Sequence, residues 1–431
     1  MSEKTKLVPK RRFKEFENAD AWEQCRLEEL YIKGGSGGTP TSTNKEYYNG
    51  CIPFLGISDI TNSNGYISRT EKTISKKGLV NSTAWLVPKG SICLAMYASV
   101  GKVAILNTDL TTSQAFYNMV FGGATVRDFV YHRLSRAIHF DEWKDQISTG
   151  TQANLNAEKV KNLKISVPEN TREVECIGVF FNQIDNLITL HQRKLEKAKE
   201  TKSAYLSEMF PAEGERKPKR RFTGFTDAWE QCRFYHLLDT TNGMRRGPFG
   251  SAIKKEFFVV ESDYVVYEQQ NAIYDRFETR YNITKEKYDD LIRFTLNPGD
   301  FIMSGAGTIG RISRVPSRIK QGIFNQALIR IRINMNIADP DYFLHWLRSA
   351  NMQRKLTEAN PASAIVNLVP MSEIREWSTH IPSFEEQKVL GLFFSKFDNL
   401  ITLHQRKLEK LQNIKKAYLN EMFIERSVSH E

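Results

Sequence analysis

An identical segment of thirteen residues occurs twice in this chain. DNLITLHQRKLEK stands at Asp185–Lys197 and, 213 positions later, at Asp398–Lys410. Two shorter matches precede the copies at a similar offset: PKRRF at Pro9–Phe13 and Pro218–Phe222, and DAWEQCR at Asp20–Arg26 and Asp227–Arg233. Because each copy of such a repeat forms the same structural unit, it constrains the fold more than any local pattern. The 431 residues are therefore predicted to be two tandem halves, each with a long divergent segment inside.

The repeated segment has the spacing of a long amphipathic helix. Apolar residues and one histidine recur mostly three or four positions apart, and each helix is predicted to span about 35 residues, or about 50 Å. A single apolar stripe needs a partner, so we expect the two helices to form an antiparallel coiled coil that joins two globular domains. Two separate helical hairpins, each packed on its own domain, are the alternative. The predicted subunit and coiled-coil interface comprises Leu187, His191, Leu195, Leu400, His404 and Leu408.

The divergent segments have short β-rich runs separated by turns such as NSNG and NPGD, which predicts a mixed α/β (α+β) fold for each. Two similar domains separated by two long helices would give the chain a pseudo-twofold organisation. The predicted segments are a first domain (1–170), a first spacer helix (171–210), a basic linker (211–222), a second domain (223–384), a second spacer helix (385–424) and a tail (425–431).

The formal net charge of +11 favours a polyanionic partner, because basic side chains release the counterions held by phosphates. The five cysteines include no CxxC pair, so neither a disulfide framework nor a zinc site is indicated, and a reducing cytoplasm fits best. The N-terminal MSEKTKLVPKRRF has no apolar core of a signal peptide, and no run approaches roughly eighteen apolar residues. We therefore expect neither secretion nor a membrane span.

The order and the amino-acid sequences of these segments resemble those of the specificity subunit (HsdS) of type I restriction–modification systems. The resemblance covers nearly the whole chain and includes IPSFEEQKVLGLFF at Ile381–Phe394, RRGPFGSAIKK at Arg245–Lys255 and the PGDFIMSGAGTIGR stretch. The start of the first helix, VPENTREVECIGVFF at Val167–Phe181, departs from the pattern, because it lacks the Glu-Gln of EEQK and has one extra residue.

The resemblance implies a non-catalytic, DNA-binding subunit. In that family each target-recognition domain reads one half of a bipartite double-stranded DNA target. The helices act as a spacer and as a platform for two methyltransferase subunits, to which two restriction subunits can add. No cofactor is then expected in this chain, and S-adenosylmethionine, ATP and Mg are expected only in the partner subunits.

Two motifs are typical of cofactor-binding or catalytic sites, but neither has the flanking structure that such a site needs. Gly305–Gly310 fits GxGxxG, but the β-like RISRV follows it where a dinucleotide site needs a helix, so we expect a hairpin turn. Glu386-Gln387-Lys388 has the Glu-x-Lys form of many nucleases, but it opens a helix, where the macrodipole favours carboxylates. The Asn/Asp-Pro-Pro-aromatic tetrapeptide of amino-methyltransferases does not occur.

These observations leave a self-contained DNA methyltransferase or nuclease, and a coiled-coil structural adaptor, as alternatives. A structural adaptor would need neither the excess of basic residues nor the divergent segments. His191 and His404 are expected to be packed on the helical stripe, and Trp22 and Trp229 are expected to anchor the domains.

Candidate DNA contacts are polar and basic residues, with two tyrosines, on loops where the halves diverge, because such side chains match base edges and phosphates. In the first half they are Lys45, Tyr47, Tyr97, Ser99, Lys102, Thr111, Thr112, Ser113, Gln114, Gln152 and Asn154. In the second half they are Arg245, Arg246, Gln269, Gln270, Asn271, Ser304, Thr308, Arg311, Asn325 and Gln326. A pseudo-twofold reader would contact two half-sites about one helical turn apart, roughly 34–36 Å, and the helix length would set the gap.

Overall fold

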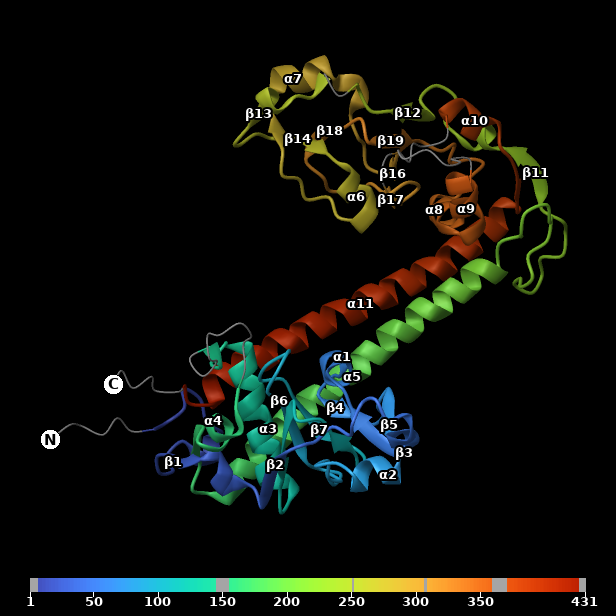
Figure 1. The fold of residues 1–431 in the computed structure, drawn as a ribbon. Helices are drawn as coiled ribbons and strands as arrows, with labels where there is room; N and C mark the ends of the chain where they lie inside the picture. Colours follow the sequence, from blue (N-terminus) through green and yellow to red (C-terminus); the bar gives the residue numbers. More distant parts are fainter. Residues whose placement is uncertain (1–6, 145–154, 250–251, 306–307, 359–369, 426–431) are drawn as a thin grey trace. The chain divides into compact units, whose positions relative to one another are not determined.

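The computed structural model describes residues 7–144, 155–249, 252–305, 308–358 and 370–425. The chain forms two compact units, Met1–Arg193 with Gln405–Glu431, and Lys194–His404. We call them unit 1 and unit 2. Each unit contains one mixed α/β domain, the first part of the long helix that follows this domain, and the last part of the other long helix, so the predicted fold class is confirmed (Figure 1).

Unit 1 contains a five-stranded sheet in the order β2-β9-β6-β7-β4, a three-stranded sheet in the order β5-β3-β8, and the pair β1-β10. Its strands are β1 (Glu23–Arg26), β2 (Lys33–Ser36), β3 (Tyr48–Leu55), β4 (Tyr66–Ile67), β5 (Lys72–Ile74), β6 (Ile92–Ala95), β7 (Val103–Leu106), β8 (Thr111–Thr112), β9 (Phe116–Val120) and β10 (Lys164–Val167). Its helices are α1 (Ile57–Asn62), α2 (Lys76–Val80), α3 (Ala124–His139), α4 (Ala157–Lys161) and the start of α5 (Thr171–Glu208).

Unit 2 repeats this plan with the sheets β12-β19-β16-β17 and β13-β15-β14-β18 and the pair β11-β20. Its strands are β11 (Glu230–Arg233), β12 (Met244–Arg246), β13 (Phe258–Val259), β14 (Tyr264–Tyr267), β15 (Asn282–Ile283), β16 (Phe301–Ser304), β17 (Ile312–Arg314), β18 (Gln321–Phe324), β19 (Leu328–Ile331) and β20 (Ser378–Ile381). Its helices are α6 (Gln269–Tyr274), α7 (Lys285–Asp290), α8 (Pro340–Arg348), α9 (Ala350–Glu358), α10 (Met371–Glu376) and the start of α11 (Phe384–Met422).

Alternation along the central strands explains how each sheet is covered on both faces. On β6, Ile92 and Leu94 join the core that holds α3 and the long helices, whereas Cys93 and Ala95 join the core beneath the three-stranded sheet. On β16, Phe301 and Met303 face α8, and Ile302 faces the other sheet. A strand buried on both faces is apolar throughout, which accounts for the runs ICLA and FIM.

The two long helices pack against each other in opposite directions within each unit. In unit 1 the ring of Phe180 on α5 meets Tyr418 on α11 with centroids 5.1 Å apart, and Asp185 Oδ1 lies 2.5 Å from Lys415 Nζ. In unit 2 the equivalent contacts are Tyr205 with Phe393 at 5.2 Å and Lys202 Nζ with Asp398 Oδ1 at 2.5 Å. The expected antiparallel pairing is therefore present in both units, and the hairpin alternative is wrong, because α5 and α11 are continuous helices of 38 and 39 residues.

A buried ionic fork anchors the start of each long helix to the PKRRF segment. Arg12 donates from Nε and Nη2 to the Glu173 carboxylate at 2.8 and 2.5 Å, and Arg221 does the same to Glu386 at 2.6 Å for both bonds. Glu386 therefore binds Arg221 in addition to lying at the positive end of the helix dipole. Glu173 has the same role toward Arg12 at the start of the first helix, although that helix lacks the EEQK sequence. The feature without a counterpart there is the side-chain amide of Gln387, which donates to Ile337 O and Pro382 O.

Each unit also buries a neutral histidine beside the helix pair. His132 on α3 donates from Nε2 to Asn182 Oδ1 at 2.9 Å, and its Nδ1 lies 3.9 Å from Asp185. Lys415 is closer to that carboxylate and compensates its charge, so desolvation by burial governs the imidazole and lowers the pKa of His132 to about 3. Burial likewise lowers the pKa of His345 on α8, 3.6 Å from Asp398, to about 2.

We predict that the chain loses stability in mild acid through these two histidines. The unfolded chain takes up protons near pH 6.5, whereas the folded chain does not until about pH 3, so the free energy of unfolding falls as the pH falls below about 6.5. The expected loss is on the order of 2 kcal/mol per histidine between pH 6.5 and 5. Urea unfolding of His132→Gln with His345→Gln at both pH values should show a smaller loss than the wild type.

The exposed His236 provides the matched control, because His236→Gln removes a histidine that lies on the surface of the folded chain. An equal acid dependence in the wild type and in the double variant would contradict the assignment of the two buried histidines as neutral.

Candidate nucleic-acid interface

Three loops of unit 1 meet at one end of the five-stranded sheet. The glycine-rich loop 37–44 is held by Gly38 N, which donates to Thr112 O at 2.9 Å, and the β6–β7 hairpin loop is held by Met96 N, which donates to Ala115 O at 2.8 Å. Both acceptors lie in or next to the short loop 113–115. We call these three loops the loop cluster of unit 1.

The loop cluster of unit 2 has the same backbone bonds. Gly247 N donates to Leu328 O at 3.0 Å, as Gly37 N does to Phe116 O at 3.3 Å. Gly305 N donates to Ala327 O at 2.7 Å, as Met96 N does to Ala115 O. The clusters therefore place largely different side chains on an equivalent backbone frame. Thr308 and Arg311 stand in unit 2 where unit 1 has Ser99 and Lys102, and Arg246 stands in place of Ser36, whereas Gln326 and Gln114 are the same residue type.

Two glycines in each cluster are required by geometry. Gly101 and Gly310 have φ angles of +83° and +77°, and their N–H groups close the hairpins onto Ala95 O and Ser304 O. A Cβ atom on Gly37 would lie 2.1 Å from Thr112 O, and one on Gly247 would lie 1.9 Å from Asn325 O. The GxGxxG segment therefore connects the antiparallel strands β16 and β17, which agrees with the prediction of a hairpin.

The hairpin loop of unit 1 is strained at the predicted contact residues. Ala98 and Ser99 both have left-handed φ angles, of 39° and 40°, which cost free energy in residues with a Cβ. Ser99 Oγ bonds Thr61 Oγ1 at 2.8 Å, and Lys102 Nζ donates to Thr61 O, so α1 holds the loop in place. Partial burial lowers the pKa of Lys102. The sequence prediction missed Thr61, which no motif marks.

Four predicted contacts are wrong, because the fold buries them. Thr111 and Thr112 form β8, which pairs in parallel with β3, and both are fully buried. Asn271 caps α6 and donates to Arg276 O and Glu278 O. Ser304 accepts from Arg311 N and shapes the hairpin loop from inside.

The other predicted contacts are exposed or half-buried and stay predictions. In unit 1 they are Lys45, Tyr47, Tyr97, Ser99, Lys102, Ser113 and Gln114. In unit 2 they are Arg245, Arg246, Gln269, Gln270, Thr308, Arg311, Asn325 and Gln326. Gln152 and Asn154 lie outside the described residues.

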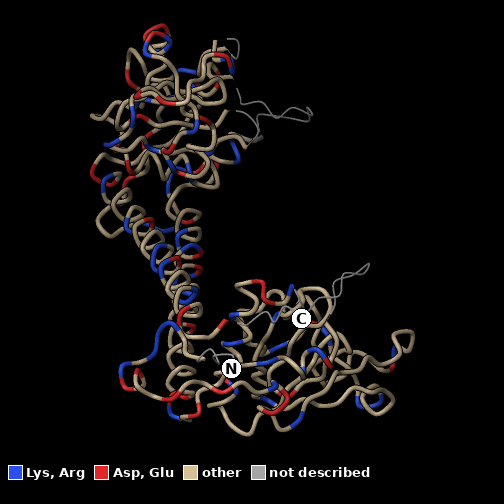
Figure 2. The backbone as a smooth tube through the Cα atoms, turned by 90° about the vertical axis from the view of Figure 1, so that its left-hand side faces the viewer, with Lys and Arg blue, Asp and Glu red and all other residues tan. Residues whose placement is uncertain are grey.

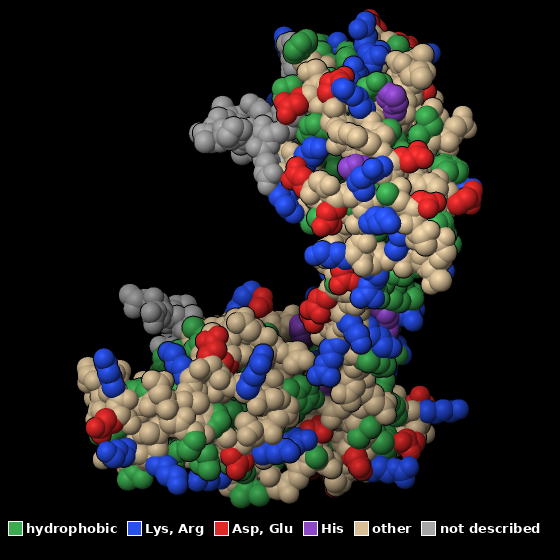
Figure 3. Space-filling view, turned by 90° about the vertical axis from the view of Figure 1, so that its right-hand side faces the viewer, with side chains coloured by type: hydrophobic (Ala, Val, Ile, Leu, Met, Phe, Trp, Pro, Cys, Tyr) green, Lys and Arg blue, Asp and Glu red, His purple; other side chains and the backbone are tan. Residues whose placement is uncertain are grey.

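The apolar residues and the histidine of the repeated helical segment lie on two stripes, one buried and one exposed. Leu195 and His404 are buried and His191 and Leu408 half-buried, whereas Leu187 and Leu400 are 44% and 40% exposed. Leu190 and Leu403, at equivalent repeat positions, are also exposed. Basic and acidic residues are interspersed along both helices (Figure 2), and hydrophobic side chains lie among them on the surface (Figure 3). Leu187 and Leu400 are therefore not in the intramolecular seam, and each helix carries the same exposed apolar pair.

A family model described as "Type I restriction modification DNA specificity domain" matches residues 19–200 and 250–413. The chain belongs to this family. The two matched ranges cover both halves, as the internal repeat requires. Each specificity domain of the family thus corresponds to one recognition segment with its helix.

Curated relatives in this family are distant in sequence. The chain is 29% identical to the type I restriction enzyme MjaIX specificity subunit of Methanocaldococcus jannaschii over 41% of this chain and 40% of that protein. It is 27% identical to the HindI specificity subunit of Haemophilus influenzae over 38% of this chain and 35% of that protein. The aligned part thus spans well under half the length of either relative.

Solved structures support the fold across the whole chain. The S subunit of a type I restriction–modification system from M. genitalium superposes with a TM-score of 0.64 at 13% identity and covers 98% of this chain and 100% of that chain. A chain from a structure concerned with complex assembly and conformational transition of the type I R-M system gives 0.52 at 14% identity, with 93% and 97% covered.

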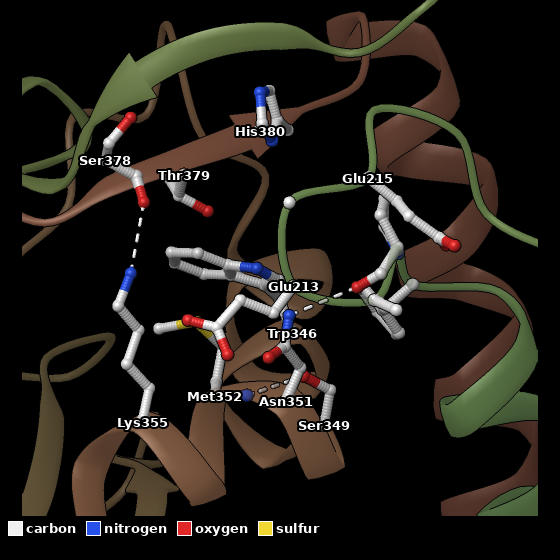
Figure 4. Close-up of a pocket in the computed structure, with 14 residues that line it drawn as sticks. Glu213, Glu215, Trp346, Ser349, Asn351, Met352, Lys355, Ser378, Thr379 and His380 are labelled. Carbon is white, nitrogen blue, oxygen red and sulfur yellow. Dashed lines mark hydrogen bonds between the residues drawn. The ribbon is translucent and has the colours of Figure 1, made fainter. Parts of the chain in front are cut away.

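The specificity-domain chain also has a cavity of about 260 Å³ in unit 2, where linker residues 211–215 cross α8 and α9 (Figure 4). Asn351 Nδ2 donates to Pro211 O at 3.2 Å and Lys355 Nζ donates to Ser378 O at 3.2 Å, beside Trp346. These polar groups fasten the linker and β20 to the domain. We assign this cavity a structural role in joining α5 to the second domain.

Within the described ranges, no group of three or more His, Cys, Asp and Glu side chains is placed to hold a metal ion. In the same ranges no helix is both long and apolar enough to cross a bilayer. Trp22 and Trp229 are buried, the first against Phe129 and Phe423 and the second against Phe210 and Tyr342, which confirms them as anchors.

Proposed function

We propose that this chain is the DNA sequence-specificity subunit of a type I restriction–modification complex and has no catalytic role of its own. The observation that carries the proposal is the loop cluster, which is built twice on the same backbone bonds with different side chains. Two recognition domains with the same backbone frame and different loop side chains suit a bipartite double-stranded DNA target, in which each half has its own sequence. The net charge of +11 and membership of the specificity family support the same partner.

The repeated exposed leucines support docking of two methyltransferase subunits. Leu187 and Leu190 on α5 and Leu400 and Leu403 on α11 offer two equivalent apolar sites, and identical sites on one chain suit two copies of one partner. Restriction subunits would join through these partners. S-adenosylmethionine, ATP and Mg would be bound in the partner subunits, and the free cysteines suit a reducing cytoplasm.

The alternatives lack such support. A self-contained methyltransferase would need the Asn/Asp-Pro-Pro-aromatic tetrapeptide, which the sequence does not contain. A structural adaptor would not need two loop clusters with different side chains. Mapping of methylated adenines across the genome, in cells with and without this chain, tests the proposal, since a specific bipartite motif should lose methylation when the chain is absent.

The two recognition domains should be exchangeable one at a time. Replacing Glu28–Val167 with the equivalent segment of a related subunit should change one half of the methylated motif and leave the other half unaltered, because each loop cluster is built within its own unit. Methylation mapping reads both halves in one experiment. If both halves of the motif changed together, the model of two independent readers would fail.

The same substitution at buried and exposed helix positions should separate folding from assembly. Leu195→Asp with Leu408→Asp should destabilise the chain by about 1.5–3 kcal/mol at the buried site, with less at half-buried Leu408. Leu187→Asp with Leu400→Asp should leave stability nearly unchanged and abolish copurification with the methyltransferase. Unfolding curves and copurification distinguish the two pairs, and unimpaired assembly of the second pair would remove the proposed docking site.

Helix length should set the gap between the two half-sites. Inserting seven helix-forming residues after Arg193 and the same seven after Arg406, equivalent repeat positions, lengthens both helices by about 10 Å with little change of register. At about 3.4 Å per base pair the preferred gap should grow by about three base pairs while both half-sites keep their sequence. An active complex with an unaltered gap would show that the helices only dock partners.

A further inference from the structure

Unit 2 has a cleft of about 380 Å³ between the adjacent strands β12 and β19 and the segment that follows α7. Arg245 on β12 stands directly opposite Arg330 on β19, so both side chains project from the same face of the sheet. Arg332 directly follows β19, two residues beyond Arg330, and Arg293 and Thr295 line the facing wall. We call this the Arg330 cleft.

Arg330 is buried without full pairing. Its side chain is 3% exposed, its Nη1 donates to Thr295 O at 3.0 Å, and its guanidinium lies over the Phe324 ring at 5.8 Å. Its Nε is buried and has no acceptor among the described residues. Desolvation, with the charges of Arg332 and Arg245, lowers the pKa of Arg330 to about 10. A buried cation with an unused donor is costly unless an anion completes its shell.

The charge around Arg330 is not balanced by protein carboxylates. Asp300 accepts from Arg332 at 2.7 and 3.1 Å, which accounts for one of the four arginines that line the cleft. None of its nine lining residues is acidic. Within the part of the chain that the structure describes, Arg245, Arg293 and Arg330 have no ion-pair partner. The outer carboxylate, Asp239, is engaged by Thr241 and by Asn242 N.

Unit 1 has no such site at the equivalent place. Asn118 on β9 takes the position of Arg330, and Gly35 on β2 takes that of Arg245. Asn118 Nδ2 donates to Gly35 O at 3.2 Å and to Thr112 Oγ1 at 2.8 Å, and its Oδ1 accepts from Cys93 Sγ at 2.8 Å. The neutral, satisfied amide in unit 1 shows that the shared fold does not require a charge there, so the arginines serve something particular to unit 2.

We propose that the Arg330 cleft binds an oxyanion of the phosphate class, held by the buried Arg330 Nε and by the guanidinium groups of Arg245 and Arg293. Planar guanidinium forks match phosphate oxygens in paired bonds, and a partly desolvated site strengthens such bonds. Resting on the function proposed above, the source is a backbone phosphate of the half-site read by unit 2. A free phosphate is the other source of the same chemistry.

Two assays on the purified full chain distinguish these sources. The test variant is Arg245→Gln with Arg293→Gln, which removes the half-buried and the exposed arginine and leaves buried Arg330 in place, so the fold is retained. The matched control is Lys254→Gln with Lys285→Gln, which removes two charges from exposed positions of the same unit that do not line the cleft.

The first assay compares thermal unfolding in sodium phosphate and in sodium chloride at equal ionic strength and pH. Phosphate should raise the midpoint of the wild type and of the control, and the test variant should show no such shift. The second assay measures DNA affinity against salt concentration. The slope of log affinity against log salt should fall by about 0.9 for each DNA phosphate that the test variant no longer neutralises, beyond any change in the control.

Each outcome decides the matter. A reduced salt slope identifies a DNA backbone phosphate, whether or not inorganic phosphate binds measurably. An abolished phosphate shift with an unchanged slope identifies a free oxyanion and overturns the DNA source. Equal behaviour of test and control variants in both assays overturns the cleft. If the wild type binds no DNA, the proposed function fails, and the phosphate assay still decides the cleft separately.

Discussion

The pairing of the long helices depends on one ion pair, made twice, of which the carboxylate in unit 1 and the ammonium in unit 2 are buried. In unit 1 Asp185 of α5 bonds Lys415 of α11, and in unit 2 Asp398 of α11 bonds Lys202 of α5. A buried carboxylate or ammonium that loses its partner costs several kcal/mol, so a shift of either helix by one turn would leave both charges uncompensated. The pair therefore fixes the direction and the register of the helices more strictly than the aromatic contacts beside it, which tolerate small displacements. The aspartate of each pair is the first residue of one copy of the thirteen-residue segment, so the duplicated segment supplies the same carboxylate in both units.

On this fixed frame the two domains vary in the loops and, at one place, in the core. The hairpins close through equivalent glycines and the forks of Arg12 and Arg221 are the same, whereas Lys102 is replaced by Arg311 and Asn118 by Arg330. Exposed replacements change what a domain can contact without a cost in stability. The replacement of Asn118 differs, because a buried cation must be compensated, and its presence indicates that a ligand completes the site.

The repeat, the helical spacing and the turn residues predicted the two halves, the long helices, the anchoring tryptophans and the hairpin at Gly305–Gly310. The errors have local causes. Thr111 and Thr112 form a strand too short to show alternation, and parallel pairing with β3 buries both side chains. No motif marks Arg330, because in LIRI it alternates with isoleucines as a solvent-facing residue would, whereas the second sheet covers that face. His132 and His345 became buried through contacts distant in sequence, which no pattern within α3 or α8 reveals.

The way in which the loops are anchored also determines the unit of exchange. Gly247 approaches Asn325 O so closely that a side chain cannot be accommodated, and Ser304 holds the hairpin loop through Arg311 N from inside the sheet. In unit 2 the strand that carries Arg330 bears on its opposite face the isoleucines that pack against α8. A loop moved alone to the other domain would lose these supporting contacts and would keep only its exposed side chains. The domain with its strands is therefore the smallest piece that carries a recognition surface intact, and the ionic forks at its ends are the same in both halves, so that a foreign domain meets the same attachment points.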